Sequence, residues 1–278
     1  INITGLVASY HFDNDSSYGE NSTRIYDFSG LQNNGTAYNG VVMNASGKIK
    51  GAASFDGVND YAVASGTILD TLPNNQLTVS AWFKHTTTSV GGVDDYIINK
   101  GRIGGGGYGL YIDTTANKVG FLTNDGSWDI VLSDNGGYND NLWHQATGVW
   151  NGTTNVLYVD GVLQSASTSA SSPTMDSTGL AIGVYYDPSP FAGSYFNGSI
   201  DEVAIFNRTL SATEVLTVYN TQKDTYPSSG EYLSVINDTG GSSSYKNFSW
   251  SSIWNQTNGY ATDGSYAPTT QTGQTNYS

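Results

Sequence analysis

The chain of 278 residues contains no cysteine, which excludes disulfide bonds, thiol chemistry and cysteine-ligated zinc. Its 10 lysines and arginines stand against 24 aspartates and glutamates, for a formal net charge of −14. Such a chain has no basic surface for phosphates, so nucleic acid is not an expected partner. Long apolar runs are missing too, so membrane insertion is not expected.

Glutamate and histidine are scarce, and this bears on catalysis. The four glutamates are Glu20, Glu202, Glu214 and Glu231, and the three histidines are His11, His85 and His144. Retaining glycosidases need two carboxyl groups about 5 Å apart in one groove, and no motif here places two glutamates on one strand in that way. The histidines match no metal-ligand spacing, so packing roles are expected for them. We therefore expect a protein that is not an enzyme.

What the sequence does contain is a series of short β-branched and aromatic runs separated by Gly, Asn, Asp and Ser, which predicts an all-β fold. Expected strands cover residues 5–12, 52–64 with a turn at Asp56-Gly57, 77–85, 94–100, 107–113, 117–122, 128–132, 142–150, 155–160, 179–184 and 197–206. Asn151-Gly152 and Asp160-Gly161 supply the positive φ angles that tight turns require. We expect Asp160-Gly161 to join two strands as a two-residue reversal.

Only one helix is expected, over residues 212–220. Ser211 precedes it as a cap, and Glu214 three residues later completes the pattern of a capping box. The strand alternation of Ile200, Val203 and Ile205 runs into this start signal.

Four segments in a fixed order resemble a known family. They are GAASFDGVNDYAVA (51–64), LTVSAWFK (77–84), LWHQATGVWNGTTNVLYVDGVLQ (142–164) and FNGSIDEVAIFNRTLSATEVLTVY (196–219). Their order and spacing are similar to those of laminin-G-like domains of the concanavalin A-like lectin and glucanase superfamily, over residues 5 to 220. The resemblance implies a two-sheet antiparallel jelly-roll sandwich with one short C-terminal helix. Because that scaffold hosts lectins, adhesion modules, spacers and some glycanases, it does not fix the function.

The composition changes near residue 226. We expect a jelly-roll domain over residues 1–226 and a polar extension rich in Ser, Thr and Asn over residues 227–278. The extension repeats aromatic residues, and YLSVI and NFSW show strand alternation. Two placements stay open, packing on its own sandwich and strand addition to a neighbouring subunit.

Sequons for N-glycosylation are frequent. They begin at Asn2, Asn14, Asn21, Asn34, Asn44, Asn151, Asn197, Asn207, Asn237, Asn247, Asn255 and Asn276. Roughly half of that number would arise by chance in a chain so rich in Asn, Ser and Thr, so the excess predicts a glycoprotein. The first residue is Ile1 and no leader pattern precedes the fold, which suggests an exported, mature product. With no cysteine, these features favour an archaeal cell-surface origin.

Calcium is the cofactor that the resemblance implies, because one structural ion ties the first strand to the last in related jelly rolls. By that resemblance Asp201 is the expected ligand, with Asp13 and the carbonyls near Gly51 beside it and Asp27 as a further candidate. In the alternative, Asp201 pairs with a backbone amide or with Lys50. A second ion among Asp94, Asp95, Asp125 and Asp129 competes with ordinary turn roles for these residues.

Carbohydrate is the other expected ligand class. Aromatic rings at the rim of the sandwich can stack against sugar rings, and the candidates are Tyr108, Trp128, Tyr138 and Tyr185. The alternative is that these rings are ordinary strand residues that pack within the fold.

Two functions are compatible with these features. The first is a non-catalytic, glycosylated extracellular structural or adhesive subunit that assembles with copies of itself into a fibre or surface layer through its extension. The second is a calcium-dependent carbohydrate-binding module of a cell-surface protein.

Overall fold

The computed structural model describes residues 3–43, 46–65, 75–86, 93–102, 106–175, 177–186, 194–224, 231–232 and 248–249. The chain divides into two units, Ile1–Thr225 and Tyr226–Ser278. In the second unit the described residues form β17 (Glu231–Tyr232) and β18 (Phe248–Ser249), which pair antiparallel. β17 ends at the first residue of the YLSVI segment, and β18 lies within NFSW.

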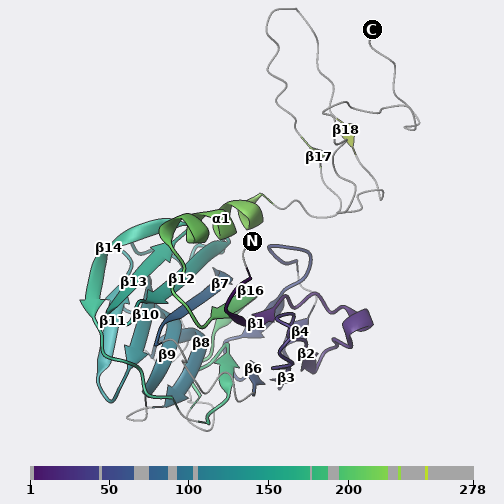
Figure 1. Cartoon of the computed structure of the whole chain (residues 1–278). Coiled ribbons are helices and arrows are strands. Elements are labelled where there is room, and N and C mark those ends of the chain that lie inside the picture. The colour runs from purple at the N-terminus through teal and green to yellow at the C-terminus, as the bar shows by residue number, and fades with distance from the viewer. Residues whose placement is uncertain are drawn as a thin grey trace, which may run out of the picture. The chain divides into compact units, whose positions relative to one another are not determined.

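The first unit is a sandwich of two antiparallel sheets, shown in Figure 1. Sheet A has the strand order β14-β13-β12-β7-β16-β5-β4, with β1 pairing beside β16. Its strands are β1 (Leu6–Tyr10), β4 (Val42–Met43), β5 (Ala53–Asp56), β7 (Leu77–His85), β12 (His144–Trp150), β13 (Thr154–Val159), β14 (Val162–Ser169) and β16 (Asn197–Phe206).

Sheet B has the order β11-β10-β9-β8-β15-β6-β3-β2. Its strands are β2 (Arg24–Ile25), β3 (Gly35–Tyr38), β6 (Tyr61–Ala64), β8 (Asp95–Arg102), β9 (Gly106–Asp113), β10 (Lys118–Asn124), β11 (Trp128–Leu132) and β15 (Leu180–Ile182). A single helical turn, η1 (Ser16–Tyr18), precedes β2. The architecture confirms the predicted two-sheet antiparallel fold with one short helix near the end of the sandwich.

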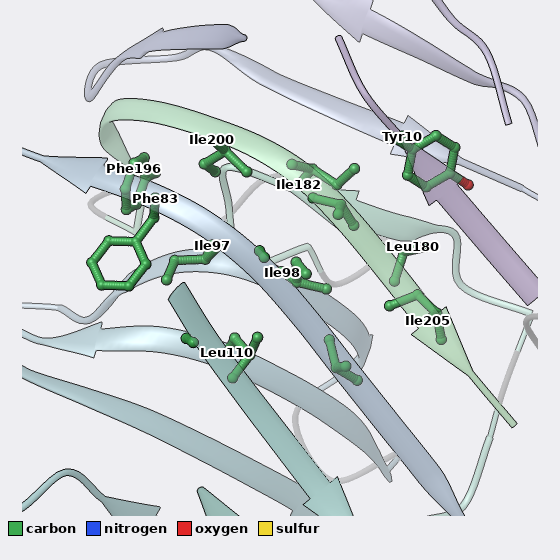
Figure 2. Packing of buried hydrophobic residues seen from close by; sticks show 14 of the residues in the cluster. Tyr10, Phe83, Ile97, Ile98, Leu110, Leu180, Ile182, Phe196, Ile200 and Ile205 are labelled. Carbon is green, nitrogen blue, oxygen red and sulfur yellow. The ribbon is translucent and has the colours of Figure 1, made fainter. Parts of the chain in front are cut away.

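The core fills the space between the sheets. Ile200 and Ile205 of β16 face Ile98 of β8 and Leu110 of β9, together with their neighbours (Figure 2). Each of these side chains is fully or almost fully buried. Burying a side chain of this kind contributes about 1.5–3 kcal/mol, so this layer is the main source of stability.

The helix α1 (Ala212–Lys223) begins at the predicted cap and ends three residues beyond the predicted end. Ser211 Oγ accepts the backbone N–H of Glu214 at 3.3 Å, and the Glu214 carboxylate accepts the backbone N–H of Ser211 at 2.9 Å. Hydrogen bonds from Arg208 and from the Ser211 backbone lower the pKa of Glu214 to about 2. None of the described helices has the length and hydrophobicity that crossing a bilayer requires.

The predicted turns are confirmed, with Gly57 and Gly152 at φ angles of 74° and 104°. Asp160 and Gly161 have φ angles of 51° and 74° and join β13 directly to β14, as expected. Residues 52–64, predicted as one strand with a turn, instead form β5 in sheet A and β6 in sheet B. The chain changes sheet at Asp56, whose carboxylate accepts the N–H of Val58 at 2.8 Å and so holds the connection.

Candidate functional site

The outer face of sheet A is covered by α1. Leu210 and Val215 pack there against Val149, Tyr158 and Phe206. A second contact layer forms around Trp82, whose ring stacks on Tyr219 of α1 at 5.6 Å, while its indole N–H donates to Gln222 at 2.9 Å. This face is therefore occupied by the protein's own helix.

The outer face of sheet B carries a layer of aromatic rings instead. Tyr96, Tyr111, Leu122 and Tyr185 form a cluster separate from the main core. The rings of Tyr96 and Tyr111 stack at 5.4 Å with an interplanar angle of 25°. Gly120 makes room for them, because a Cβ at this position would overlap the Tyr111 ring.

A small crevice opens on sheet B, at the end of this layer. Its lining consists of Asn99, Lys100, Gly101, Gly106, Gly107, Tyr108, Leu122, Asn124, Trp128 and Tyr185. The empty volume is about 140 Å³, including space open to solvent. Pockets that enclose a drug-sized ligand measure roughly 300–1,000 Å³. Almost none of this volume admits even a water molecule, so a ligand here would lie on the surface beside the crevice rather than inside it.

Trp128 provides that surface. Its side chain is 42% exposed, and it lies across from Asn124 in the β10–β11 pairing. A large exposed ring offers an apolar face to a ligand, whereas the neighbouring Asn99 and Asn124 are each 2% exposed. Asn124 also accepts the Gly126 N–H at 2.7 Å, and Asn99 accepts the Tyr186 N–H at 3.0 Å. These bonds hold both amides in place at the crevice.

Three of the four predicted sugar-contacting residues meet at this crevice: Tyr108, Trp128 and Tyr185. The predicted stacking role does not fit Tyr108, because its ring is 1% exposed and belongs to the core. Tyr185 is also buried, packed edge-on against Tyr96 at 5.1 Å. Tyr138 packs against Phe83 and His144 at 6.4 and 5.0 Å and is not part of the crevice lining.

Sequence reasoning missed the two amides. Asn99 and Asn124 occur in a chain where Asn is common, so composition gives them no prominence. The signal was strand register, because an Asn opposite an exposed Trp on one face forms a shared contact surface.

The predicted calcium residues are brought together only in part. Asp201 is fully buried, and its Oδ2 accepts the backbone N–H groups of Lys48 and Ile49, each at 2.9 Å. Asp13 accepts the Gly51 N–H at 3.0 Å, and its other oxygen lies 3.3 Å from the Lys50 ammonium. Asp13 and Asp201 therefore both bind the loop of residues 47–51, which contains Gly51.

The Asp201 site already satisfies its carboxylate with donors. Besides the two amides of the loop, the Glu202 N–H donates to Asp201 Oδ1 at 2.7 Å. Burial and the nearby Glu202 charge raise the pKa of Asp201 to about 8. These residues as arranged do not form a ligand set for a hard cation, since N–H groups and an ammonium stand where a cation would act. Calcium here stays a prediction.

Asp27 belongs to a different arrangement. Its carboxylate accepts the N–H groups of Ser9 at 3.0 Å and of Asn33 at 2.9 Å, and the Ser29 hydroxyl at 2.7 Å. Asp27 thus holds the segment after β2 against β1. Among the described residues, no cluster of three or more His, Asp or Glu side chains could hold a metal ion.

The histidines each pair with a carboxylate. His85 and Asp95 are both fully buried, with Nε2 and Oδ2 2.9 Å apart. His144 lies 2.8 Å from Asp160. Burial alone would lower the pKa of His144, but the hydrogen bond and charge of Asp160, with Asp140, raise it. These pairs fit the expected packing roles.

Six of the sequons fall among the described residues: Asn14, Asn21, Asn34, Asn151, Asn197 and Asn207. Asn21 and Asn151 are exposed in turns, where each Oδ1 accepts the hydroxyl of the threonine two positions later. Asn34 is partly buried and accepts the Asp27 N–H at 2.9 Å. The predictions for Asn2, Asn44, Asn237, Asn247, Asn255 and Asn276 lie outside the described residues.

Solved structures of similar fold are binding domains. The binding domain of Paraclostridial Mosquitocidal Protein 1 aligns with a TM-score of 0.62 and 16% identity over 79% of this chain and 52% of that one. The binding domain of botulinum neurotoxin DC, in complex with SialylT, aligns with a TM-score of 0.60 and 13% identity over 80% and 52%. This chain thus spans about half the length of the toxin binding domains.

A third structure is matched over nearly its full length. Domain 4 of AbnA, a GH43 extracellular arabinanase from Geobacillus stearothermophilus, in complex with arabinotriose, aligns with a TM-score of 0.59 and 18% identity over 77% of this chain and 98% of that one. Identities this low show the fold alone. No curated protein matches the chain.

The family is shown by sequence. A family model described as the concanavalin A-like lectin/glucanases superfamily matches residues 56–216, which is more than half of the 278 residues. The matched range runs from the turn after β5 into α1 and includes the Trp128 crevice. This chain belongs to the laminin-G-like family of the concanavalin A-like lectin/glucanase superfamily.

Proposed function

We propose that this domain is a non-catalytic carbohydrate-binding module of an extracellular protein, and that it binds sugar at the Trp128 crevice. The observation that carries the proposal is the exposed Trp128 ring beside Asn99 and Asn124 on the outer face of sheet B. A fold whose solved relatives include a domain in complex with arabinotriose supports it. We therefore favour carbohydrate binding over the role of a self-assembling structural subunit, which the sequence alone favoured.

The expected ligand is a neutral sugar. Among the described lining residues only Lys100 is charged, and it is 1% exposed, with its ammonium donating to the Thr178 carbonyl. An anionic sugar would meet no exposed cation in this lining and would face a chain of net charge −14. A neutral sugar can instead place its C–H face on the exposed Trp128 indole, while Asn99 and Asn124, each 2% exposed, hold the wall beside it.

No catalytic role follows from the glutamates of the sandwich, Glu20, Glu202 and Glu214. The Glu214 carboxylate is engaged by Arg208 and Ser211, and Glu202 accepts from Gln222 on the sheet A side. Glu20 accepts the backbone N–H groups of Asp15 and Tyr26. None of these glutamates lines the crevice.

The test is affinity electrophoresis of the full chain in gels that contain arabinan, arabinoxylan, β-glucan or mannan. Wild-type protein should be retarded by at least one of them, and Trp128→Ala should weaken binding at least tenfold or so, as loss of a central aromatic contact does. Leu142→Ala is the control, because Leu142 is 61% exposed and absent from the crevice lining. Equal retardation of wild type and Trp128→Ala would refute the assigned site.

Calcium dependence and glycosylation are separate proposals. The Asp201 carboxylate is already engaged by N–H donors, so chelator is expected to leave both thermal stability and sugar affinity unchanged; a loss of either on chelation would favour a calcium site. For glycosylation, Asn21 and Asn151 are the described acceptors with the most accessible turns. Mass spectrometry of glycopeptides from native material should find them occupied.

Self-assembly through residues 227–278 also stays a proposal. The described part of the extension is the short β17–β18 pair, and the remainder lies outside the described residues. Short paired strands provide edges to which another chain can add. Negative-stain microscopy of the full chain should show filaments. Truncation after residue 226 should leave the sandwich folded and abolish these filaments.

A further inference from the structure

Three further tyrosines gather on sheet B, outside the crevice. Tyr38 of β3 and Tyr61 of β6 are direct partners in the strand pairing, and their rings stack at 4.8 Å with an interplanar angle of 13°. Tyr186 lies beside them, with its ring 6.0 Å from that of Tyr61. Tyr38 is 42% exposed. We call these three residues the tyrosine stack.

The tyrosine stack lies on the same face of sheet B as Trp128. Along β6, Ala62 and Ala64 point into the core, so Tyr61 points outward, and Tyr38 follows as its cross-strand partner. Along β10 and β11, Phe121 and Val131 point into the core, so Trp128 also points outward.

Sheet order sets the separation of the two aromatic sites. From β11 to β3 the order β11-β10-β9-β8-β15-β6-β3 takes six steps between neighbouring strands. At about 4.8 Å per step, Tyr38 and Trp128 lie on the order of 30 Å apart across the sheet. Tyr186 lies nearer, because its N–H donates to Asn99 of the crevice lining. A monosaccharide or disaccharide on Trp128 cannot reach Tyr38.

The polar groups of the stack are neutral hydroxyls. Partial burial and the neighbouring phenols of Tyr186 and Tyr38 raise the pKa of Tyr61, so the hydroxyl stays protonated at neutral pH. A stacked pair of rings edged by hydroxyl groups can take the C–H face of a sugar and also hydrogen-bond to its substituents.

The size of the stack favours a sugar chain over a protein partner. A tyrosine offers at most about 150–250 Å² of surface, whereas a specific protein interface buries about 800 Å² on each side. Three partly exposed rings fall short of that area. They suffice for one or two sugar rings.

We propose that the tyrosine stack is a second sugar-binding site, and that the natural ligand is an extended neutral polysaccharide that contacts both the stack and the Trp128 crevice. This inference rests on the proposed function, because it assumes that sheet B binds carbohydrate. It adds the ligand's length and a second set of contacts.

The experiment compares short and long ligands on the full chain. The polysaccharide that retards the wild type is used intact and as an oligosaccharide ladder from disaccharide upward, and affinities are measured by isothermal titration calorimetry. Affinity should rise with chain length. Tyr38→Ala and Tyr61→Ala should each weaken binding of the intact polysaccharide roughly threefold to tenfold and leave disaccharide binding unchanged.

Tyr38→Phe is the matched control, since it keeps the ring and removes the hydroxyl, and thermal melting of each variant establishes that it folds. Retention of most affinity by Tyr38→Phe supports stacking. Two results would overturn the second site alone. One is an affinity that does not depend on the length of the sugar chain. The other is wild-type binding by Tyr38→Ala and Tyr61→Ala when Trp128→Ala has lost binding. Failure of every polysaccharide to retard the wild type overturns the proposed function, and the second site with it.

Discussion

The two outer faces of this sandwich use aromatic residues for different ends. On sheet A, Trp82 is 2% exposed beneath α1, with its ring on Tyr219 and the Lys48 ammonium 4.5 Å from its centroid. On sheet B, Trp128 is 42% exposed and has no helix above it among the described residues. Tryptophan therefore packs beneath the helix on sheet A, as Trp82, and is accessible to a ligand on sheet B, as Trp128.

The difference comes from the connections between the strands. β16 leads into a capped helix that folds back over its own sheet, and polar side chains such as Gln145 and Gln222 bond to each other in between. In sheet B, β9, β10 and β11 follow one another through short turns, and Gly120 leaves room for the Tyr111 ring on that sheet. The middle of the sheet B face is also buried, at Tyr96, Tyr111 and Tyr185, so the rings available for recognition are those exposed away from it, Trp128 and Tyr38.

The largest expected effect separates the two tryptophans. Trp82→Ala should lower the free energy of unfolding by about 3–5 kcal/mol, because it leaves a large cavity under α1. Trp128→Ala should change it by no more than about 0.5 kcal/mol, as is usual at the surface, while sugar binding is lost. Urea denaturation of both variants measures this, and a Trp128→Ala loss as large as that of Trp82→Ala would erase the contrast.

The next effect concerns pH and lies on the sheet A side. The pKa of Asp201 is raised to about 8 in the folded protein, so between about pH 4 and pH 8 the folded state holds a proton that the unfolded state releases. Stability should therefore fall as pH rises through this window, by an amount on the order of a few kcal/mol.

Asp201→Asn is the matched variant, because it keeps the shape and cannot ionise. Its stability should vary less with pH over this window than that of the wild type, as followed by thermal melting at each pH. Sugar affinity on sheet B should be the same in both proteins at a given pH. The prediction would be contradicted if the wild type became more stable from pH 4 to pH 8 and the Asp201→Asn variant did not show this gain.

A smaller effect tests the ring layer of sheet B. Gly120→Ala should cost about 1–3 kcal/mol, because the added methyl group overlaps the Tyr111 ring. The Tyr111→Ala background should relieve the overlap, so a double-mutant cycle by urea denaturation should show coupling between the two positions. Additive changes would mean that Gly120 is not there to accommodate the ring.

The smallest effect concerns the helix that closes sheet A. Ser211→Ala removes the acceptor for the Glu214 N–H and should cost about 1 kcal/mol. Ser211→Asp keeps an acceptor at this position and should retain most of the stability. Chemical denaturation distinguishes the two, and equal losses would show that the cap is not what stabilises α1.

Sequence patterns predicted the long elements of this fold well. β7 and β16 begin and end at the predicted residues because long alternating runs leave little choice of register. α1 was predicted from Ser211 and Glu214 for a similar reason, since a capping box is a local chemical signal. β2, β3 and β4 were missed because strands of two to four residues carry too short a pattern.

The site was less predictable because it depends on long-range pairing. The sequence marks both Trp128 and Tyr108 as aromatic residues near loops. Trp128 is exposed because it lies on the outer side of its strand, and Tyr108 is buried because it lies on the core side. Tyr38 and Tyr61 lie 23 residues apart and meet only because β3 pairs with β6. Residue type alone does not predict that two residues distant in the sequence will be in contact.

The position of α1 also determines where the polypeptide departs from the sandwich. The helix ends at Lys223, whose carbonyl accepts the Lys48 ammonium at 2.6 Å, beside the Gln222 contact with Trp82. The backbone thus exits on the reverse of the proposed recognition surface. Force applied to the chain at the end of α1 would therefore load α1 and β16 of sheet A and no strand of sheet B.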